Sequence, residues 1–224
     1  MREVCPVCLH SEPRLFYSEP GWDYWRCENC LATYLDSSQL PGPGHELQRY
    51  CEHNNDPQDP SYRKFLNKLA RPLLQRLRPG SRGLDFGCGP GPGLAWILRE
   101  AGHWVRLYDP FFYPQETLLQ QSYDFVACCE VVEHLHQPYQ EFCLLRNLLQ
   151  PGGWLGIMTS FQTQDENFAC WRYRQDPTHV VFYKQETFQV LARLLGLECH
   201  VPRKNVVLLQ RPWEDPKPAS LAEP

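Results

Sequence analysis

The sequence predicts an α/β protein built on a doubly wound parallel sheet, with a small four-cysteine module in front of it. Two observations predict the sheet: strand-like and helical runs alternate from Arg82 onward, and a glycine-rich turn follows the first strand. A third observation, two C-x2-C pairs within the first 30 residues, predicts the module. The 224 residues leave room for one ordinary α/β domain and one small addition.

The composition is that of a globular protein, with 42% hydrophobic and 21% charged residues. A net charge of −4 gives no overall reason to expect nucleic acid or an anionic membrane as a partner. No apolar run is long enough for a membrane span, and the N-terminus shows no secretory signal. We therefore expect a cytoplasmic protein whose 11 cysteines are reduced.

Residues 1–40 form the predicted module, which resembles a zinc ribbon. Its cysteines follow the spacing C-x2-C-x18-C-x2-C, at Cys5, Cys8, Cys27 and Cys30. This spacing fits a structural zinc ion held by four thiolates, with a β-hairpin between the two pairs. Redox chemistry is the alternative, but it rarely needs two pairs. The module holds three arginines against six acidic residues, which makes it a poor binder of phosphate.

The rest of the chain divides into a linker, a domain and a tail. Residues 41–60 are dense in Pro, Gly, Asn and Asp and indicate a linker. The α/β domain spans residues 61–212 and begins with an amphipathic helix at 61–78, which Ser61 caps and Pro72 kinks. Residues 213–224 lack periodicity and predict a flexible tail.

Apolar runs rich in β-branched and aromatic residues mark the strands, and Pro-Gly turns separate them from helices. We expect strands at 82–87, 104–109, 123–131 and 152–161, helices at 92–102, 138–149 and 185–196, and a terminal antiparallel hairpin of 197–203 and 205–212.

A glycine turn follows the first strand and opens the next helix. In LDFGCGPGPG the pattern is G-x-G-x-G, not the G-x-G-x-x-G of dinucleotide-binding folds. Asp85 precedes the turn, where a carboxylate suits an amino group better than a pyrophosphate. Asp109 ends the second strand, where an acid can accept hydrogen bonds from both hydroxyls of a ribose. Strand, acids, turn and helix together predict a ligand site.

Four motifs in this order resemble class I S-adenosylmethionine-dependent methyltransferases: GLDFGCGPGPG, the acid of LYDP, YDFVACCEVVEHL and LLQPGGWLGIM. The resemblance covers residues 82–210 and implies a Rossmann-like sheet with S-adenosylmethionine as cofactor. It implies a cofactor site in which Asp109 holds the ribose, and Cys129 and Glu130 lie near the adenine or the methyl group. The methionine part would be held by Asp85, Gly87, Cys88, Gly89 and Gly91.

One segment departs from this family. Methyltransferases of this class place a helix and a third strand between Asp109 and Tyr123, where this chain has only residues 110–122. A strand needs about five residues and a helix about eight, before any loop. We therefore expect the third strand to be missing or reduced to a bridge, with 104–109 as the sheet edge. An aromatic residue would then cover the adenine, the nearest being Phe111, Phe112 and Tyr113.

The run EVVEHL places two carboxylates and an imidazole just after a strand. Glu130, Glu133 and His134 could hold a hard cation, and they resemble the E-x-x-E-H of ubiquinone-pathway O-methyltransferases, where these positions bind magnesium. The alternative is a packing and capping role without metal, as in related methyltransferases that carry an acid–His pair here.

The polar and aromatic segment 161–183 is predicted to build the acceptor pocket, because it is too polar for a core strand. His179 could act as general base, since an ordinary imidazole pKa of about 6.5 suits proton removal at neutral pH. A histidine bonded to backbone is the alternative. The other candidate catalytic residues are Tyr173, Glu133 and His134, and further candidates for the pocket are Trp171, Asp176 and Thr178.

These features predict methyl transfer from S-adenosylmethionine to a small or carrier-bound metabolite by in-line displacement. One alternative is an RNA methyltransferase that reads its substrate through the zinc module, and the basic stretch at 62–82 would suit it. Another is a non-catalytic protein that binds S-adenosylmethionine. The acidic module argues against nucleic acid as a partner.

Overall fold

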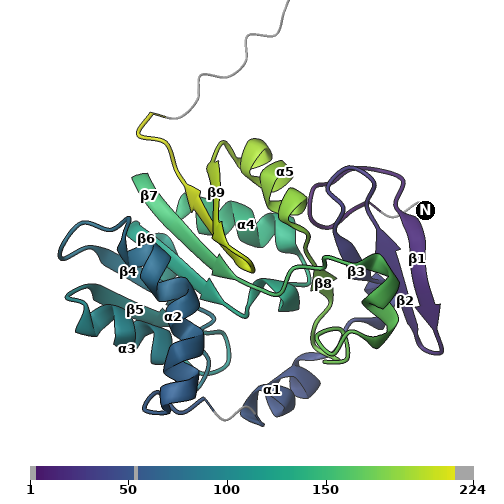
Figure 1. Ribbon diagram of the computed structural model, residues 1–224, viewed down its shortest axis with the longest axis horizontal. Coiled ribbons are helices and arrows are strands. Elements are labelled where there is room, and N and C mark those ends of the chain that lie inside the picture. Colours follow the sequence, from purple (N-terminus) through teal and green to yellow (C-terminus); the bar gives the residue numbers. More distant parts are fainter. Residues whose placement is uncertain (1–3, 53–54, 215–224) are drawn as a thin grey trace, which may run out of the picture.

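The computed structural model describes residues 4–52 and 55–214, whose strands form two sheets (Figure 1). The larger sheet has six strands in the order β5-β4-β6-β7-β10-β9. Strands β5, β4, β6 and β7 run parallel, and β10 is antiparallel to both of its neighbours, as predicted for a terminal hairpin. The strands are β4 (Arg82–Phe86), β5 (Trp104–Tyr108), β6 (Tyr123–Cys129), β7 (Leu149–Met158), β9 (Glu198–Arg203) and β10 (Val206–Gln210).

Helices cover both faces of this sheet, so the predicted doubly wound arrangement is confirmed. The helices α2 (Pro60–Leu74) and α3 (Gly93–Glu100) pack on one face, and α4 (Pro138–Asn147) and α5 (Gln185–Leu195) belong to the other. Successive side chains of β6 point to opposite faces of the sheet, so β6 packs against both layers of helices. Phe125 and Ala127 join the core under α2 and α3, whereas Val126 and Cys128 join the core under α4 and α5.

Among the described residues, no third parallel strand lies outside β5, which confirms the prediction made from the short connection. Asp109 forms a single antiparallel bridge with Tyr113, and the 3-10 helix η2 (Glu116–Gln120) fills the rest of the connection to β6. Strand β5 is therefore the edge of the sheet. The residues after it are free to fold back toward the end of β4 instead of continuing the sheet.

The smaller sheet joins the N-terminal module to the α/β domain. It contains β1 (Arg14–Glu19), β2 (Trp22–Arg26) and β3 (Thr33–Leu35), and its fourth strand is β8 (Val181–Phe182). Figure 1 shows β8 beside β3, far from it in sequence. The prediction that 161–183 is too polar for core structure is wrong at its end, because Val180 to Tyr183 are all buried. Their apolar side chains complete a core shared by both sheets.

The segment predicted as a linker contains the helix α1 (Pro43–Cys51). Pro43 suits the first turn of a helix, where no backbone N–H is needed. The same argument applies to α2, which begins at Pro60 with Asp59 as its cap, not Ser61. Helix α2 ends at Leu74, two residues after Pro72 and four before the predicted end. The 3-10 helix η1 (Ser37–Gln39) precedes α1.

Strand β7 begins and ends three residues earlier than predicted, because the PGG turn lies inside it. The pairing with β6 shifts register between Tyr123 and Phe125, and this irregularity accommodates Gly152 at φ of 78°. The predicted tail lies largely outside the described residues, although Trp213 contacts Arg78. Within the described part of the chain, no helix has the length and apolar character to cross a membrane.

Candidate functional site

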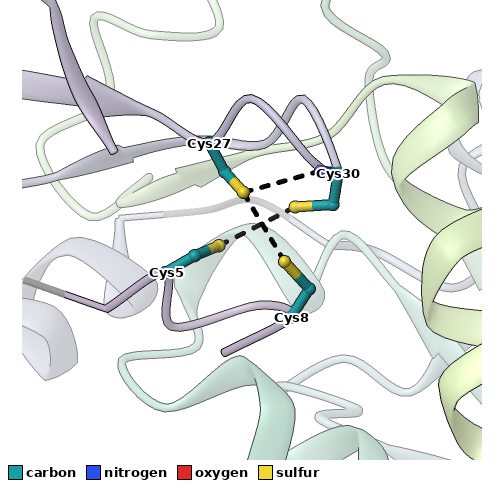
Figure 2. A group of neighbouring side chains, drawn as sticks. All are labelled: Cys5, Cys8, Cys27 and Cys30. Atoms are coloured by element: carbon teal, nitrogen blue, oxygen red, sulfur yellow. Dashed lines mark hydrogen bonds between the residues drawn. The ribbon is translucent and has the colours of Figure 1, made fainter. Parts of the chain in front are cut away.

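The four cysteines of the module converge on one point, as Figure 2 shows. Their sulfur atoms all lie within 4.8 Å of one another, with 3.7 Å from Cys5 to Cys30 and 3.5 Å from Cys8 to Cys27. A tetrahedral zinc site with bonds of about 2.3 Å places its sulfur ligands about 3.8 Å apart, whereas a disulfide needs about 2.05 Å. All four thiols are free and almost fully buried. Their geometry fits a zinc ion.

The two C-x2-C pairs fold in the same way, which explains the convergence. The N–H of Leu9 donates to the carbonyl of Cys5, and the N–H of Leu31 donates to that of Cys27, both at 2.9 Å. Both leucines have φ near 60°, in the left-handed region that closes a tight turn.

One cavity of about 840 Å³ lies at the carboxyl ends of β4, β5 and β6. This is where open α/β sheets bind ligands, because the loops after parallel strands leave a crevice there. Six of the residues predicted to bind the cofactor line this cavity: Gly87, Cys88, Gly89, Asp109, Cys129 and Glu130. Three of the predicted catalytic residues also line it: Tyr173, His134 and His179. The sequence therefore located the cavity.

The glycine loop needs glycine for two different reasons. Gly87 and Gly89 have φ of 70° and 62°, a region where an L side chain is strained. At Gly91 the obstacle is packing, since a Cβ would lie 2.1 Å from the carbonyl oxygen of Asn55. The loop is held to the edge strand by hydrogen bonds from the N–H groups of Gly87 and Cys88 to the carbonyl of Tyr108.

Asp109 is fixed by three backbone amides. One carboxylate oxygen accepts from the N–H of Gly89, and the other accepts from the N–H groups of Phe111 and Phe112. A carboxylate has about four acceptor positions, so this arrangement leaves about one for a ligand. The expectation that Asp109 accepts from both ribose hydroxyls would require one of these amides to move. Phe111 and Phe112 line the cavity, as predicted for an aromatic cover, and Tyr113 does not.

Two predicted cofactor residues do not line the cavity. Asp85 is 2% exposed, and its carboxylate accepts from the N–H of Ala95 in the first turn of α3. Burial raises its pKa to about 7. Gly91 lies against Asn55 instead of facing the cavity. Asp85 is therefore a cap for α3, where the sequence motif suggested a direct contact to the ligand.

A chain of hydrogen bonds runs behind the cavity. Tyr173 donates to Glu133 at 2.5 Å, and its hydroxyl lies 3.0 Å from that of Thr159. Glu133 is fully buried in the 3-10 helix η3 (Val132–His134), and its second oxygen has no hydrogen-bond partner. Burial raises the pKa of Glu133, and burial together with the charge of Glu133 raises that of Glu130 to about 9.

Two imidazoles complete this cluster. His134 Nδ1 lies 2.9 Å from the carbonyl of Thr178, and His179 Nδ1 lies 2.6 Å from that of Tyr173. A carbonyl only accepts, so each Nδ1 carries the proton and each Nε2 has its lone pair. His179 is thus bonded to backbone through Nδ1, and its role as a base stays a prediction that would use Nε2.

The predicted magnesium triad is not supported. The side chains that come together are Glu133, His134 and His179, each with a ligand-type atom within 4.8 Å of the others, and Glu130 is not among them. Glu130 directly follows β6 with φ of 53°, whereas Glu133 lies in η3. Two imidazoles and one carboxylate are also a poor set for magnesium, which prefers oxygen.

Helix α1 forms the side of the cavity that the sequence did not reveal. Glu46 and Tyr50 line it, and Arg49 donates two hydrogen bonds to one oxygen of Asp176, at 2.9 and 3.0 Å. These bonds lower the pKa of Asp176. Of the other pocket candidates, Trp171 and Thr178 do not line the cavity. No motif marked α1, because its few apolar positions sit in a Pro- and Gly-rich context.

Comparison with known proteins places this architecture in a family. A family model described as "Methyltransferase domain" matches residues 59–200. No curated protein sequence matches the chain. A similar solved structure is the 1,6-didemethyltoxoflavin-N1-methyltransferase of Burkholderia thailandensis with bound 1,6-didemethyltoxoflavin and S-adenosylhomocysteine. It is 14% identical, with a TM-score of 0.53 over 90% of this chain and 99% of that one.

A second similar structure is the magnesium protoporphyrin IX methyltransferase of Synechocystis PCC 6803 with bound S-adenosylhomocysteine. It is 15% identical, with a TM-score of 0.51 over 75% of this chain and 94% of that one. At these identities the two structures show a shared fold. Since the family model spans α2, the whole parallel part of the sheet and the glycine loop, the chain belongs to the methyltransferase domain family.

Proposed function

We propose that this protein transfers the methyl group of S-adenosylmethionine to a small molecule. The observation that carries the proposal is that one cavity joins two kinds of residues. Gly87, Gly89 and Asp109 lie at the end of the sheet where this fold binds its cofactor, and Tyr173 and His179 line the same cavity. A binding protein without catalysis would have no need for the second set.

The cavity suits S-adenosylmethionine in shape and charge. The glycine loop brings backbone close to the ligand, and Asp109 retains an acceptor position for a ribose hydroxyl. Phe111 and Phe112 offer aromatic surface for the adenine. When bound, S-adenosylmethionine supplies a methyl group on a positively charged sulfur. Among the described lining residues none is Lys or Arg, so no positive side chain opposes that charge.

His179 is the proposed base. Its Nδ1–H is held by the carbonyl of Tyr173, so Nε2 is the nitrogen that can take a proton from the acceptor. The proton would make the imidazole positive, and the positive ring favours the ionised form of Glu133 nearby. Tyr173 holds one oxygen of Glu133 by its hydrogen bond. The cluster thus orients the base and stabilises its charge.

Two alternatives have less support. A phosphate-bearing acceptor, either RNA or a phosphopantetheine carrier, would meet no Lys or Arg among the described residues that line the cavity. Two of the four basic side chains of α2 have other contacts, since Arg63 pairs with Glu100 and Lys68 lies over Phe65. A non-catalytic role leaves the cluster of Glu133, Tyr173 and His179 unexplained.

Transfer of labelled methyl groups tests the proposal. The zinc-loaded protein is incubated with methyl-labelled S-adenosylmethionine and a cell extract separated into small-molecule, protein and RNA fractions. We expect label in the small-molecule fraction, and we expect His179→Ala to slow its transfer while binding S-adenosylhomocysteine with unchanged affinity in calorimetry. His45→Ala, an exposed histidine of α1, is the matched control and should change neither. Label confined to RNA or protein, or no binding of S-adenosylhomocysteine, would contradict the proposal.

A further inference from the structure

We infer that the methyl acceptor is an amine, a small molecule that enters as a cation and carries no phosphate or carboxylate. It would bind in the part of the cavity between α1 and residues 173–179. The inference rests on the proposed function, because it assigns the acceptor of that same reaction. Three features of the cavity lead to it: its charge, its chain of rings and the position of the base.

The acidic groups of the lining have no basic side chain beside them. Five carboxyl groups line the cavity, and among the described lining residues none is Lys or Arg; they belong to Glu46, Asp109, Glu130, Glu141 and Asp176. Glu130, with a pKa raised to about 9, is neutral at pH 7, so the negative charge comes from the other four. An anionic acceptor would lose water of hydration on entering and find no opposite charge, a large penalty in a partly buried site. A cation finds its counter-charges already in place. The lining therefore selects against anions.

The five carboxylates differ in what already binds them. Asp109 accepts from three amides, and Asp176 accepts from Arg49 and Thr178. Glu46, which is 8% exposed, has one oxygen 3.0 Å from Nε2 of His136 and leaves its other oxygen for a ligand. Glu46 thus keeps an acceptor position for a cation on the α1 side of the cavity.

The rings of five lining residues form a continuous chain along the same cavity. The ring of Tyr50 lies 5.7 Å from that of Phe111 and 5.2 Å from that of His134, measured between centroids. His134 is 4.7 Å from His179, which is 4.2 Å from Tyr173. Ring faces attract cations within about 6 Å, more strongly when water is excluded. Rings combined with carboxylates are the surface that organic ammonium groups prefer.

The base completes the requirement for an amine. An ammonium nitrogen has no lone pair, so it must lose one proton before it can react, and Nε2 of His179 can take it. The free amine nitrogen then forms a bond to the methyl carbon while the carbon–sulfur bond breaks and its electron pair stays on sulfur. The methylated product is again an ammonium ion, and the proton on His179 leaves to water. Atoms and charges balance without a further reactant.

Calorimetry on the zinc-loaded protein saturated with S-adenosylhomocysteine tests this inference. Three probes share a phenethyl group and differ in the head group that it carries: phenethylamine, phenethyl alcohol and 3-phenylpropionate. We expect the amine to bind about tenfold or more tightly than the carboxylate, with the alcohol between them. Equal or tighter binding of the carboxylate, or no binding of the amine, would overturn the inference.

Two variants locate the effect. Glu46→Gln should reduce the preference for the amine by several-fold, whereas Glu166→Gln, an exposed glutamate outside the cavity, should leave it unchanged. An equal preference for the amine in wild type and Glu46→Gln would show that Glu46 does not contact the acceptor. Binding of S-adenosylhomocysteine is measured first in each protein. Its failure would count against the proposed function, and its success without a preference for amines would count against this inference alone.

Discussion

Replacing Gly87 by alanine should destabilise the fold and weaken cofactor binding through two separable effects. Gly87 has φ of 70°, where an L side chain costs about 1–2 kcal/mol. A Cβ there would also lie 2.6 Å from Cγ2 of Val131 and 2.8 Å from its Cγ1. Because a valine side chain is stiff, the whole residue must move, which should add about 1–3 kcal/mol.

Gly80→Ala is the matched control, because Gly80 has φ of 74° and nothing within 4 Å of the added Cβ. The control measures backbone strain alone, so the difference between the variants measures the displacement of Val131. Val131 follows Glu130 and lines the cavity, so we expect about tenfold weaker binding of S-adenosylhomocysteine in Gly87→Ala only. Urea unfolding and calorimetry give the two quantities. Equal destabilisation by both variants, or unchanged affinity in Gly87→Ala, would refute this reasoning.

Three further predictions concern zinc, pH and α1. The purified protein should hold about one zinc ion per chain by elemental analysis. Cys27→Ser should lose both the zinc and stability, whereas Cys170→Ser, which changes an exposed thiol, should lose neither. A stable wild-type protein without zinc would contradict this. Burial raises the pKa of Asp85 to about 7 in the fold from an ordinary 3.8, so its contribution to stability is full below about pH 4 and is lost as pH rises toward 7. The free energy of unfolding of Asp85→Asn, measured with urea from pH 4 to 7, should therefore rise relative to that of wild type as pH rises. If the two free energies change with pH in parallel, the raised pKa is excluded. Arg49→Ala should change global stability by less than about 1 kcal/mol, since the Arg49 side chain is 35% exposed, but it should speed amide exchange in α1. The control Arg193→Ala, which changes an exposed arginine of α5, should leave amide exchange in α1 unchanged. Equal exchange in the two variants would show that Asp176 does not hold α1 in place.

The local signals of the sequence were sufficient to place the residues proposed to bind the cofactor. Gly87, Gly89 and Asp109 are determined by the turn between one strand and one helix, so their spacing alone indicates where they lie. The same is true of the cysteine pairs, which fold as two identical turns. The missing third strand followed from chain length, because 13 residues cannot span a helix and a strand.

The side of the cavity formed by α1 and residues 173–179 depends on contacts between distant segments, and there the local signals failed. Helix α1 lies at the cavity through contacts with distant segments, one of which is the bond from Arg49 to Asp176, 127 residues later. Asp85 looked like a ligand contact, yet its direction is set by the position of α3. The magnesium triad was predicted from neighbours in sequence, whereas the structure brings Glu133 and His134 together with the distant His179.

The sequence by itself determined the doubly wound sheet, the glycine loop and the four-cysteine cluster, because each is encoded by residues within one turn or by hydrophobic periodicity. Only the tertiary structure decided that the module and the domain share a sheet, since β3 pairs with β8 across 145 or more residues of chain. That pairing positions the residues around His179: the N–H of Leu35 donates to the carbonyl of Val180, whose own N–H donates to Glu133. Backbone pairing over such a distance leaves no periodic trace, because any strand with a free edge and an apolar face could have taken the place of β8.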